Sequence, residues 1–268
     1  MTMSTSEYGV NAHVEDGVAV IELQRPAAGN ALDAVMKAGL LTAVRKVAAA
    51  GPEVRAVLLT AQGANFCTGQ DLKEHARNLA DGPGAAFATV REDYNPLVEA
   101  FHYLHPPVVC AIEGACVGAG LGIALCADIR VAADSAHFAT AFTKIGLAAD
   151  SGLSRALTQA VGRSRATGLL LLGERFGAKE AYDWGLVHRV TGSGDAAAQG
   201  LALAHELAAG PTVAYREAKR LLRDAATADL RTALDREAAA QEVLGATQDH
   251  RDAVTAFLSR QRPTFHGR

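Results

Sequence analysis

The stretch PPVVCAIEGACVGAGLGIALCADIRVAAD, residues 106–134, decides the fold class of this chain. Its apolar run VVCAIEG (108–114) predicts a buried strand, and the glycine-rich segment ACVGAGLGIALCA (115–127) predicts the start of a helix. DIRVAAD (128–134) predicts a further strand. A strand, a helix and a strand in this order imply parallel strands joined by a helical crossover. We therefore expect an α/β protein.

The same alternation extends toward the N-terminus. VNAHVEDGVAVIEL (10–23) alternates apolar and polar residues across a turn at Asp16-Gly17, which predicts a hairpin. Asp33 is placed to cap a helix that follows it, and VRAVLLTAQG (54–63) reads as a short buried strand. A loop and a polar segment come next. A helix over 94–104 then ends at the His-Pro-Pro sequence.

The pattern of predicted secondary structure changes after the Gly-Ser-Gly at 192–194. Beyond it, segments with helical periodicity and little strand character follow one another: 196–210, 211–226, 230–245 and 250–261. We predict a core over residues 1–192 and a C-terminal helical region over residues 193–268. This region is expected to cover the core or a neighbouring subunit.

Composition excludes several classes of protein. With 268 residues, 49% hydrophobic and 21% charged, the chain is typical of a folded domain. A net charge of −3 without a dense Lys/Arg run argues against nucleic acid as a partner. The longest apolar stretch, 116–127, is too short for a membrane span, and residues 1–10 read as a loose tail without a signal sequence. The four cysteines lack metal-ligand spacing, so we expect buried free thiols in a cytoplasmic protein.

Two glycine-containing loops follow predicted strands, FCTGQDL (66–72) and EGACVGAGLG (113–122). Ligands collect at such strand ends in α/β folds. The second loop has neither the glycine spacing of a dinucleotide site nor the Gly-Lys-Ser/Thr ending of a phosphate loop. Two backbone N–H groups that converge from these loops would form an oxyanion hole. The alternative is that the glycines only permit tight packing of a helix on the sheet.

Together with AVIELQRPAAGNALD, KIGLAADSG, GERFGAKEAYDWGLVHRV and AFLSRQRPTF, these segments resemble the crotonase superfamily, the enoyl-CoA hydratase/isomerase family. The resemblance covers nearly the whole chain. It implies a spiral of ββα units with a C-terminal helical region, assembled as a homotrimer or hexamer. It also implies an acyl-CoA thioester as substrate, with no metal and no cofactor other than the coenzyme A of the substrate itself.

The resemblance also assigns roles to residues. The oxyanion donors would be the N–H groups of Gln70 and Ala119. Contacts with the substrate would come from Gly69, Gln70, Asp71, Leu72, Lys73, Ala119, Phe142 and Phe257. For Lys73 a solvated side chain at a helix start, and for Phe257 ordinary helix packing, are the alternatives.

This chain departs from the family's hydratases at two positions. Where those enzymes carry the two glutamates that activate water, it has Gly122 and Phe142. Asp150, which follows GLAA, occupies the place of an aspartate in the family's dienoyl-CoA isomerases and ring-epoxide phenylacetyl-CoA isomerases. Its apolar neighbours Ile145, Leu147 and Ala148 would bury it and raise its pKa. Before the resemblance is considered, an Asp at this place predicts a helix N-cap.

The expected activity is therefore that of an acyl-CoA isomerase. Asp150 would act as acid and base to shift a double bond, or to rearrange a ring epoxide, in fatty-acid or phenylacetate metabolism. The alternatives are an enoyl-CoA hydratase (a lyase), a hydrolase or dehalogenase with Asp150 as nucleophile, and a non-catalytic acyl-CoA binder. The scattered histidines and the EDY sequence at 92–94 are expected to be structural or on the surface.

Overall fold

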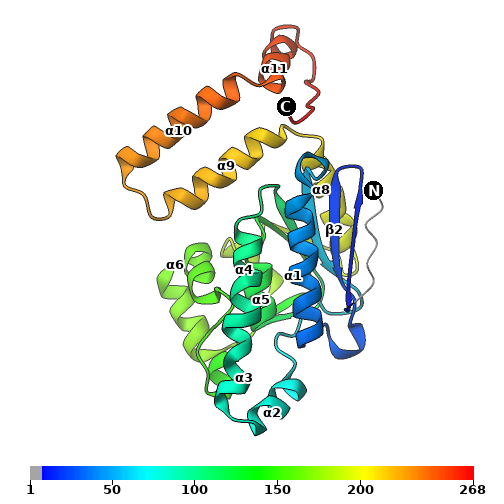
Figure 1. Ribbon diagram of the computed structural model, residues 1–268, viewed down its shortest axis with the longest axis vertical. Helices are drawn as coiled ribbons and strands as arrows, with labels where there is room; N and C mark the ends of the chain where they lie inside the picture. The colour runs from blue at the N-terminus through cyan, green and yellow to red at the C-terminus, as the bar shows by residue number, and fades with distance from the viewer. Residues whose placement is uncertain (1–7) are drawn as a thin grey trace.

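A computed structural model describes residues 8–268, so the greater part of the expected N-terminal tail lies outside the described residues. The chain builds a six-stranded sheet and a three-stranded sheet that are surrounded by helices (Figure 1). The strands of the larger sheet, in spatial order, are β1 Val10–Glu15, β2 Val18–Leu23, β3 Ala56–Ala61, β4 Val108–Ile112, β6 Ile129–Ala133 and β9 Arg189–Thr191. Those of the smaller sheet are β5 Ala115–Val117, β7 His137–Ala139 and β8 Phe176–Gly177.

The larger sheet confirms the predicted topology. Strands β1 and β2 pair antiparallel around Asp16-Gly17, with Val10 opposite Leu23. Every later neighbour in this sheet is parallel: β2 with β3, β3 with β4, β4 with β6, and β6 with β9. The chain is thus an α/β protein whose parallel strands are joined by helical crossovers.

The chain also forms helices, some of which cover both faces of the larger sheet while others extend away from it. They are α1 Ala34–Ala49, α2 Leu72–Ala80, α3 Pro83–Thr89, α4 Asn95–His102, α5 Ala119–Ala124, α6 Leu153–Leu172, α7 Ala178–Asp183, α8 Ala196–Ala208, α9 Thr212–Ala225, α10 Leu230–Gly245 and α11 Gln248–Leu258. Asp33 caps α1 as predicted, because its carboxylate accepts the Met36 N–H at 2.8 Å. Helix α1 buries Met36, Leu40 and Val44 against the sheet, while α8 packs Leu203 and Ala204 against the other face.

Two parts of the sequence prediction were wrong in detail. The glycine-rich segment begins as strand β5, because Ala115–Val117 pairs with β7 and Cys116 with Cys67, and the helix starts only at Ala119. The polar segment before Tyr94 holds helices α2 and α3 and one π-helical turn, Val90–Tyr94. These helices escaped detection because, at nine and seven residues, they are too short to show a clear helical periodicity.

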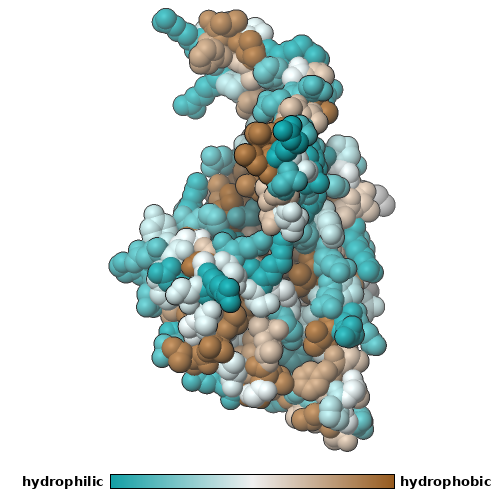
Figure 2. Space-filling view, turned by 90° about the vertical axis from the view of Figure 1, so that its left-hand side faces the viewer, coloured by the Kyte–Doolittle hydropathy of each residue, from teal (hydrophilic) through white to brown (hydrophobic). Residues whose placement is uncertain are grey.

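The C-terminal region divides into two parts. Helix α8 belongs to the core, whereas α9, α10 and α11 form an arm that extends away from it (Figure 1). Apolar side chains gather on this arm at the upper end of the molecule (Figure 2). They include Leu222, Leu230, Leu234, Val243, Val254, Phe257 and Leu258, all exposed. Within residues 8–268 the helices are too short or too polar to cross a bilayer.

Candidate active site

The first glycine loop fixes the peptide unit between Gly69 and Gln70. The carbonyl oxygen of Gly69 accepts the Leu32 N–H at 2.8 Å, and the carbonyl of Leu32 accepts the Asp71 N–H at 3.1 Å. Because a trans peptide directs its N–H opposite to its C=O, the Gln70 N–H points away from Leu32. Among residues 8–268 it meets no hydrogen-bond acceptor of the protein. A left-handed φ of 89° at Gly69 permits this turn.

The start of helix α5 lies directly beside this peptide unit. A Cβ atom on Gly69 would stand 3.4 Å from the Ala119 nitrogen and 2.9 Å from the Val117 carbonyl oxygen. Ala119 is the first residue of α5, so its N–H has no partner within the helix. Within the part of the chain that the structure describes, the Gln70 and Ala119 amides, from different loops, both lack a protein acceptor and lie side by side. This arrangement stabilises negative charge on a carbonyl oxygen.

Close packing explains why the glycines of α5 recur at every second position. A Cβ atom on Gly120 would stand 2.6 Å from the Cys67 carbonyl oxygen, and one on Gly122 would stand 2.8 Å from the Cβ of Ser151. The loop that carries Asp150 therefore rests against the face of α5 at the point where hydratases of the family carry a glutamate. Tight packing and a pair of free amides are both present here, and they are compatible.

Asp150 lies at a sharply bent piece of backbone. Ser151 is 2% exposed and has a left-handed φ of 52°, and Gly152 follows with 69°. The Ser151 hydroxyl donates to the Asp150 carboxylate at 2.8 Å. Helix α6 begins only at Leu153, with Gly152 as its N-cap, so the expectation that Asp150 caps this helix with its side chain was wrong. The carboxylate is thus left free for another task.

Burial raises the pKa of the Asp150 carboxyl above its usual value, as expected, while the Ser151 hydrogen bond and the positive charge of Lys37 lower it. The residues that cause the burial differ from those expected. Ile145 is 55% exposed and Ala148 is exposed too, whereas Leu147 packs against the core. A carboxylate whose pKa is raised toward neutral pH is suited to accept and return a proton.

Phe142 lies at the back of the same site. It begins a 3₁₀ turn, Phe142–Ile145, that follows Ala141, a residue with a left-handed φ of 64°. Its ring stands 4.0 Å from the place of a Cβ on Gly118, the residue before Ala119. Phe142 therefore supplies an apolar wall next to the two amides. It carries no group that could hold or ionise a water molecule.

The residues expected to contact coenzyme A fall into two groups. Asp71 is buried and structural: it accepts from Arg25 at 2.8 Å and from the N–H groups of Lys73 and Glu74, and the Arg25 hydrogen bond lowers its pKa. Leu72 is 57% exposed and Lys73 is exposed beside it, at the start of α2. These two are accessible to a ligand.

Phe257 does not join this group. It is 81% exposed on α11, at the opposite end of the molecule from α2 (Figure 1). The chain's own fold leaves it far from Gln70 and Ala119.

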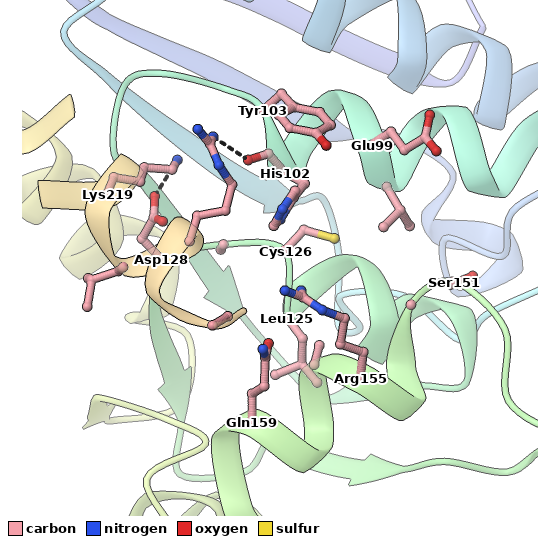
Figure 3. Close-up of a pocket in the computed structure, with 17 residues that line it drawn as sticks. Glu99, His102, Tyr103, Leu125, Cys126, Asp128, Ser151, Arg155, Gln159 and Lys219 are labelled. Carbon is pink, nitrogen blue, oxygen red and sulfur yellow. Dashed lines mark hydrogen bonds and ion pairs between the residues drawn. The ribbon is translucent and has the colours of Figure 1, made fainter. Parts of the chain in front are cut away.

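A cleft of about 800 Å³ opens next to the Asp150 loop (Figure 3). It is bounded by Ser151 and Gly152, although Asp150 and the two amides do not line it. Arg155 projects into it from α6, and Lys219 lies across the cleft on α9. Burial, together with the charge of Arg155, lowers the pKa of His102 on the facing helix α4.

Two residues of this site escaped the sequence analysis. Tyr94, expected on a helix surface, is 1% exposed and donates its hydroxyl proton to the Gln70 side-chain oxygen at 2.5 Å. Lys37, on the inner side of α1, is 2% exposed. The break in the apolar spacing of α1 at this lysine was the available signal, because a Lys on a buried helix face requires charged partners.

A core of parallel strands, two free amides at the strand ends and a partly buried carboxylate define an enzyme that acts on a carbonyl compound. The family model for enoyl-CoA hydratase/isomerase matches residues 13–268. The 1,2-epoxyphenylacetyl-CoA isomerase of Escherichia coli (strain K12) is 39% identical over 96% of this chain and 98% of its own. A candidate enoyl-CoA hydratase of Rhodobacter capsulatus is also 39% identical, over 98% of this chain and 100% of its own.

A solved structure of a candidate enoyl-CoA hydratase/isomerase from Mycobacterium abscessus is 54% identical, with a TM-score of 0.94 over 97% of this chain and 100% of its own. The chain belongs to the enoyl-CoA hydratase/isomerase family, also called the crotonase family. Its fold is the crotonase fold. The family acts on acyl-CoA thioesters.

Proposed function

We propose that the protein is an acyl-CoA isomerase in which Asp150 moves a proton between two carbons of the acyl group. One observation carries this proposal: Asp150 is a half-buried carboxylate with a raised pKa, and the two places of the hydratase glutamates hold Gly122 and Phe142. Neither of these residues can take up a proton. This chain is equally similar to a protein named isomerase and to one named hydratase, so the identity values do not distinguish the two activities. The residues at positions 122, 142 and 150 are therefore the basis of the proposal.

The proposed reaction needs only the residues already described. The N–H groups of Gln70 and Ala119 donate to the thioester oxygen, and the Asp150 carboxylate removes a proton from the acyl chain. The electron pair of the broken C–H bond passes into the enolate, whose charge rests on the oxygen between the two amides. Asp150 then returns the proton at a different carbon, so the double bond moves and the atoms balance. With a ring epoxide, the protonated form of Asp150 donates its proton to the epoxide oxygen as the C–O bond breaks, and the resulting carboxylate takes a proton back as the rearranged product forms.

Substrate comparison tests this proposal. The purified protein is offered 2-enoyl-CoA, 3-enoyl-CoA, 3,5-dienoyl-CoA and 1,2-epoxyphenylacetyl-CoA, and water addition is followed separately from rearrangement. We expect rearrangement of at least one substrate and negligible hydration. The Asp150→Asn variant should lose about 10³-fold in kcat, whereas Asp183→Asn, which alters an exposed surface carboxylate, should not.

Three outcomes would contradict the proposal. Fast hydration of 2-enoyl-CoA would make the protein a hydratase in spite of Gly122 and Phe142. An ester on Asp150, trapped from a halogenated aromatic acyl-CoA and detected by mass spectrometry, would assign a nucleophilic mechanism. Tight acyl-CoA binding with every rate unaffected by Asp150→Asn would indicate a binding protein.

We also propose that the chain forms a homo-oligomer through the arm. Helices α10 and α11 expose Leu230 (75%), Phe257 (81%) and Leu258 (77%). Exposed apolar side chains grouped in this way mark a surface that contacts another protein. Phe257 reaches a coenzyme A molecule, as the family resemblance suggests, only if the molecule is bound by a neighbouring subunit.

A further inference from the structure

The ammonium group of Lys37 is a buried cation that contacts the segment 72–94. The side chain of Lys37 is 1% exposed. Its ammonium group donates to the Thr89 hydroxyl and lies 3.4 Å from the Asp93 carboxylate and 3.8 Å from that of Glu74. Removing an ammonium from water costs several kcal/mol unless such partners compensate it. A leucine at this position of α1 would pack without that cost. The contacts of the ammonium group therefore indicate what the charge does.

Tyr94 is the link from this cation to the site. The Lys37 ammonium stands 5.0 Å from the centre of the Tyr94 ring, within cation–π range. The phenol hydroxyl donates to the Gln70 side-chain oxygen at 2.5 Å, and the Gln70 side-chain amide faces the Glu74 carboxylate at 3.5 Å. Lys37, Tyr94 and Gln70 therefore form a continuous chain of contacts, from the inner face of α1 to the residue that carries the first free amide.

This chain of contacts holds the side chain of Gln70, whereas the hydrogen bonds of the loop hold its backbone. The peptide on its N-terminal side is fixed by the hydrogen bond from Leu32 to Gly69, and the next peptide by the bond from Asp71 to Leu32. Among residues 8–268, only Tyr94 and, more weakly, Glu74 hold the side chain itself. Burial and the negative charge of Asp150 raise the pKa of Tyr94, so the phenol stays a neutral donor across the physiological range.

We propose that Tyr94 is a positioning residue: braced by Lys37, it clamps the side chain of Gln70 and thereby aims the Gln70 N–H at the thioester oxygen. This inference rests on the proposed function only in taking that N–H as an oxyanion donor. A donor that is misdirected by a fraction of an ångström loses much of its effect on the developing charge. The opposing possibility is that Lys37 and Tyr94 only tie the segment 72–94 to α1.

The experiment measures the aim of the amide directly. Phenylacetyl-CoA labelled with ¹³C at the thioester carbonyl is bound to the protein, and the shift of its carbonyl stretch to lower frequency is recorded by difference infrared spectroscopy. Tyr94→Phe should reduce this shift and lower kcat about tenfold, with KM changed less than twofold. Tyr182→Phe is the matched control, because Tyr182 is 53% exposed on α7, and it should change neither quantity.

A double-mutant cycle separates positioning from packing. Gln70→Ala keeps the backbone N–H and removes the side chain that Tyr94 holds. If Tyr94 acts through Gln70, then Tyr94→Phe should cost nothing further in the Gln70→Ala background. Lys37→Met fills the same space without charge, and it should reduce the carbonyl shift as Tyr94→Phe does. If Tyr94→Phe does not fold, Lys37→Met tests the same inference.

The results that overturn this inference are distinct from those that overturn the isomerase proposal. Losses from Tyr94→Phe and Gln70→Ala that multiply, or an unchanged carbonyl shift in Tyr94→Phe, would leave Tyr94 with a packing role. The carbonyl shift requires no proton transfer. It therefore remains measurable even if Asp150→Asn proves fully active and the isomerase proposal fails.

Discussion

The packing beside the candidate site and the packing of the arm are opposite in kind. On α5 a single added atom at Gly120 or Gly122 would stand less than 3.0 Å from Cys67 or Ser151. On α10, a Cβ on Gly245 would meet nothing within 4 Å. The first region is tightly packed by its own chain. The second exposes apolar side chains that its own chain does not cover, so the same kind of substitution should have opposite consequences in the two.

The largest expected effect comes from placing a glutamate in each region. Gly122→Glu must displace the Ser151 backbone, and we expect a loss of about 3 kcal/mol in the free energy of unfolding, or about 6–12 °C in Tm. It should not create a hydratase, because the displaced loop carries Asp150. The control Gly245→Glu should leave Tm within about 1 °C, because the side chain points into open space at the last residue of α10. A stable Gly122→Glu variant that adds water to 2-enoyl-CoA would show that α5 is not too tightly packed to accept a side chain at this position.

Charge on the arm should act on assembly and leave the fold unchanged. Phe257→Asp combined with Leu258→Asp is expected to weaken self-association by at least about tenfold, since a carboxylate would have to be buried at each contact. Light scattering over a range of protein concentrations measures this. Leu171→Asp is the comparison variant, because Leu171 is 69% exposed at the end of α6, outside the arm. An equal loss of mass in both variants would show that the arm is not the principal interface.

A smaller effect is expected from the hydroxyl that touches Asp150. Ser151→Ala removes a hydrogen bond that lowers the pKa of this carboxyl, so the pKa should rise. Because the base must be ionised, the acid limb of the kcat–pH profile should move to higher pH. On the acid side of this limb, the rate relative to the plateau rate should fall about two- to tenfold. Ser154→Ala, an exposed serine on α6, should leave the profile in place. An acid limb that moved to lower pH would contradict this prediction, because it would mean that the Ser151 hydrogen bond raises the pKa of the carboxyl.

The smallest expected effect concerns stability. The pKa of Asp150 is raised in the folded protein above its ordinary value of 3.8, so its contribution to stability is complete below pH 3.8 and is lost as the pH rises through the folded pKa. Asp150→Asn resembles the protonated form at every pH. It should raise Tm by about 1–3 °C at pH 7.5 and by nothing at pH 4. A lower Tm at pH 7.5, measured by differential scanning fluorimetry, would mean that the charged carboxylate stabilises the fold.

The sequence was sufficient wherever local signals agree with tertiary packing. The Asp16-Gly17 hairpin, the Asp33 cap and the apolar strands were predicted correctly, because burial and hydrogen bonding are there determined within a few residues. It failed at Tyr94 and Asp150. Tyr94 stands in a polar sequence, and its burial depends on Lys37, which is 57 positions away in the chain. Asp150 lost its role as a cap because Ser151 and Gly152 both adopt left-handed backbone, which delays the helix.

The thiol of Cys67 has a further consequence for a protein that handles thioesters. Cys67 immediately precedes the Thr68-Gly69-Gln70 turn, and a Cβ on Gly120 would stand 2.8 Å from its sulfur. Burial raises the pKa of this thiol to about 12, so the thiol stays protonated at neutral pH. Exchange of the acyl group onto a protein sulfur needs the thiolate and room to approach. The dense packing under the glycine loop therefore also protects the substrate: it keeps the acyl group on coenzyme A, and it makes the protein insensitive to alkylating reagents at this position.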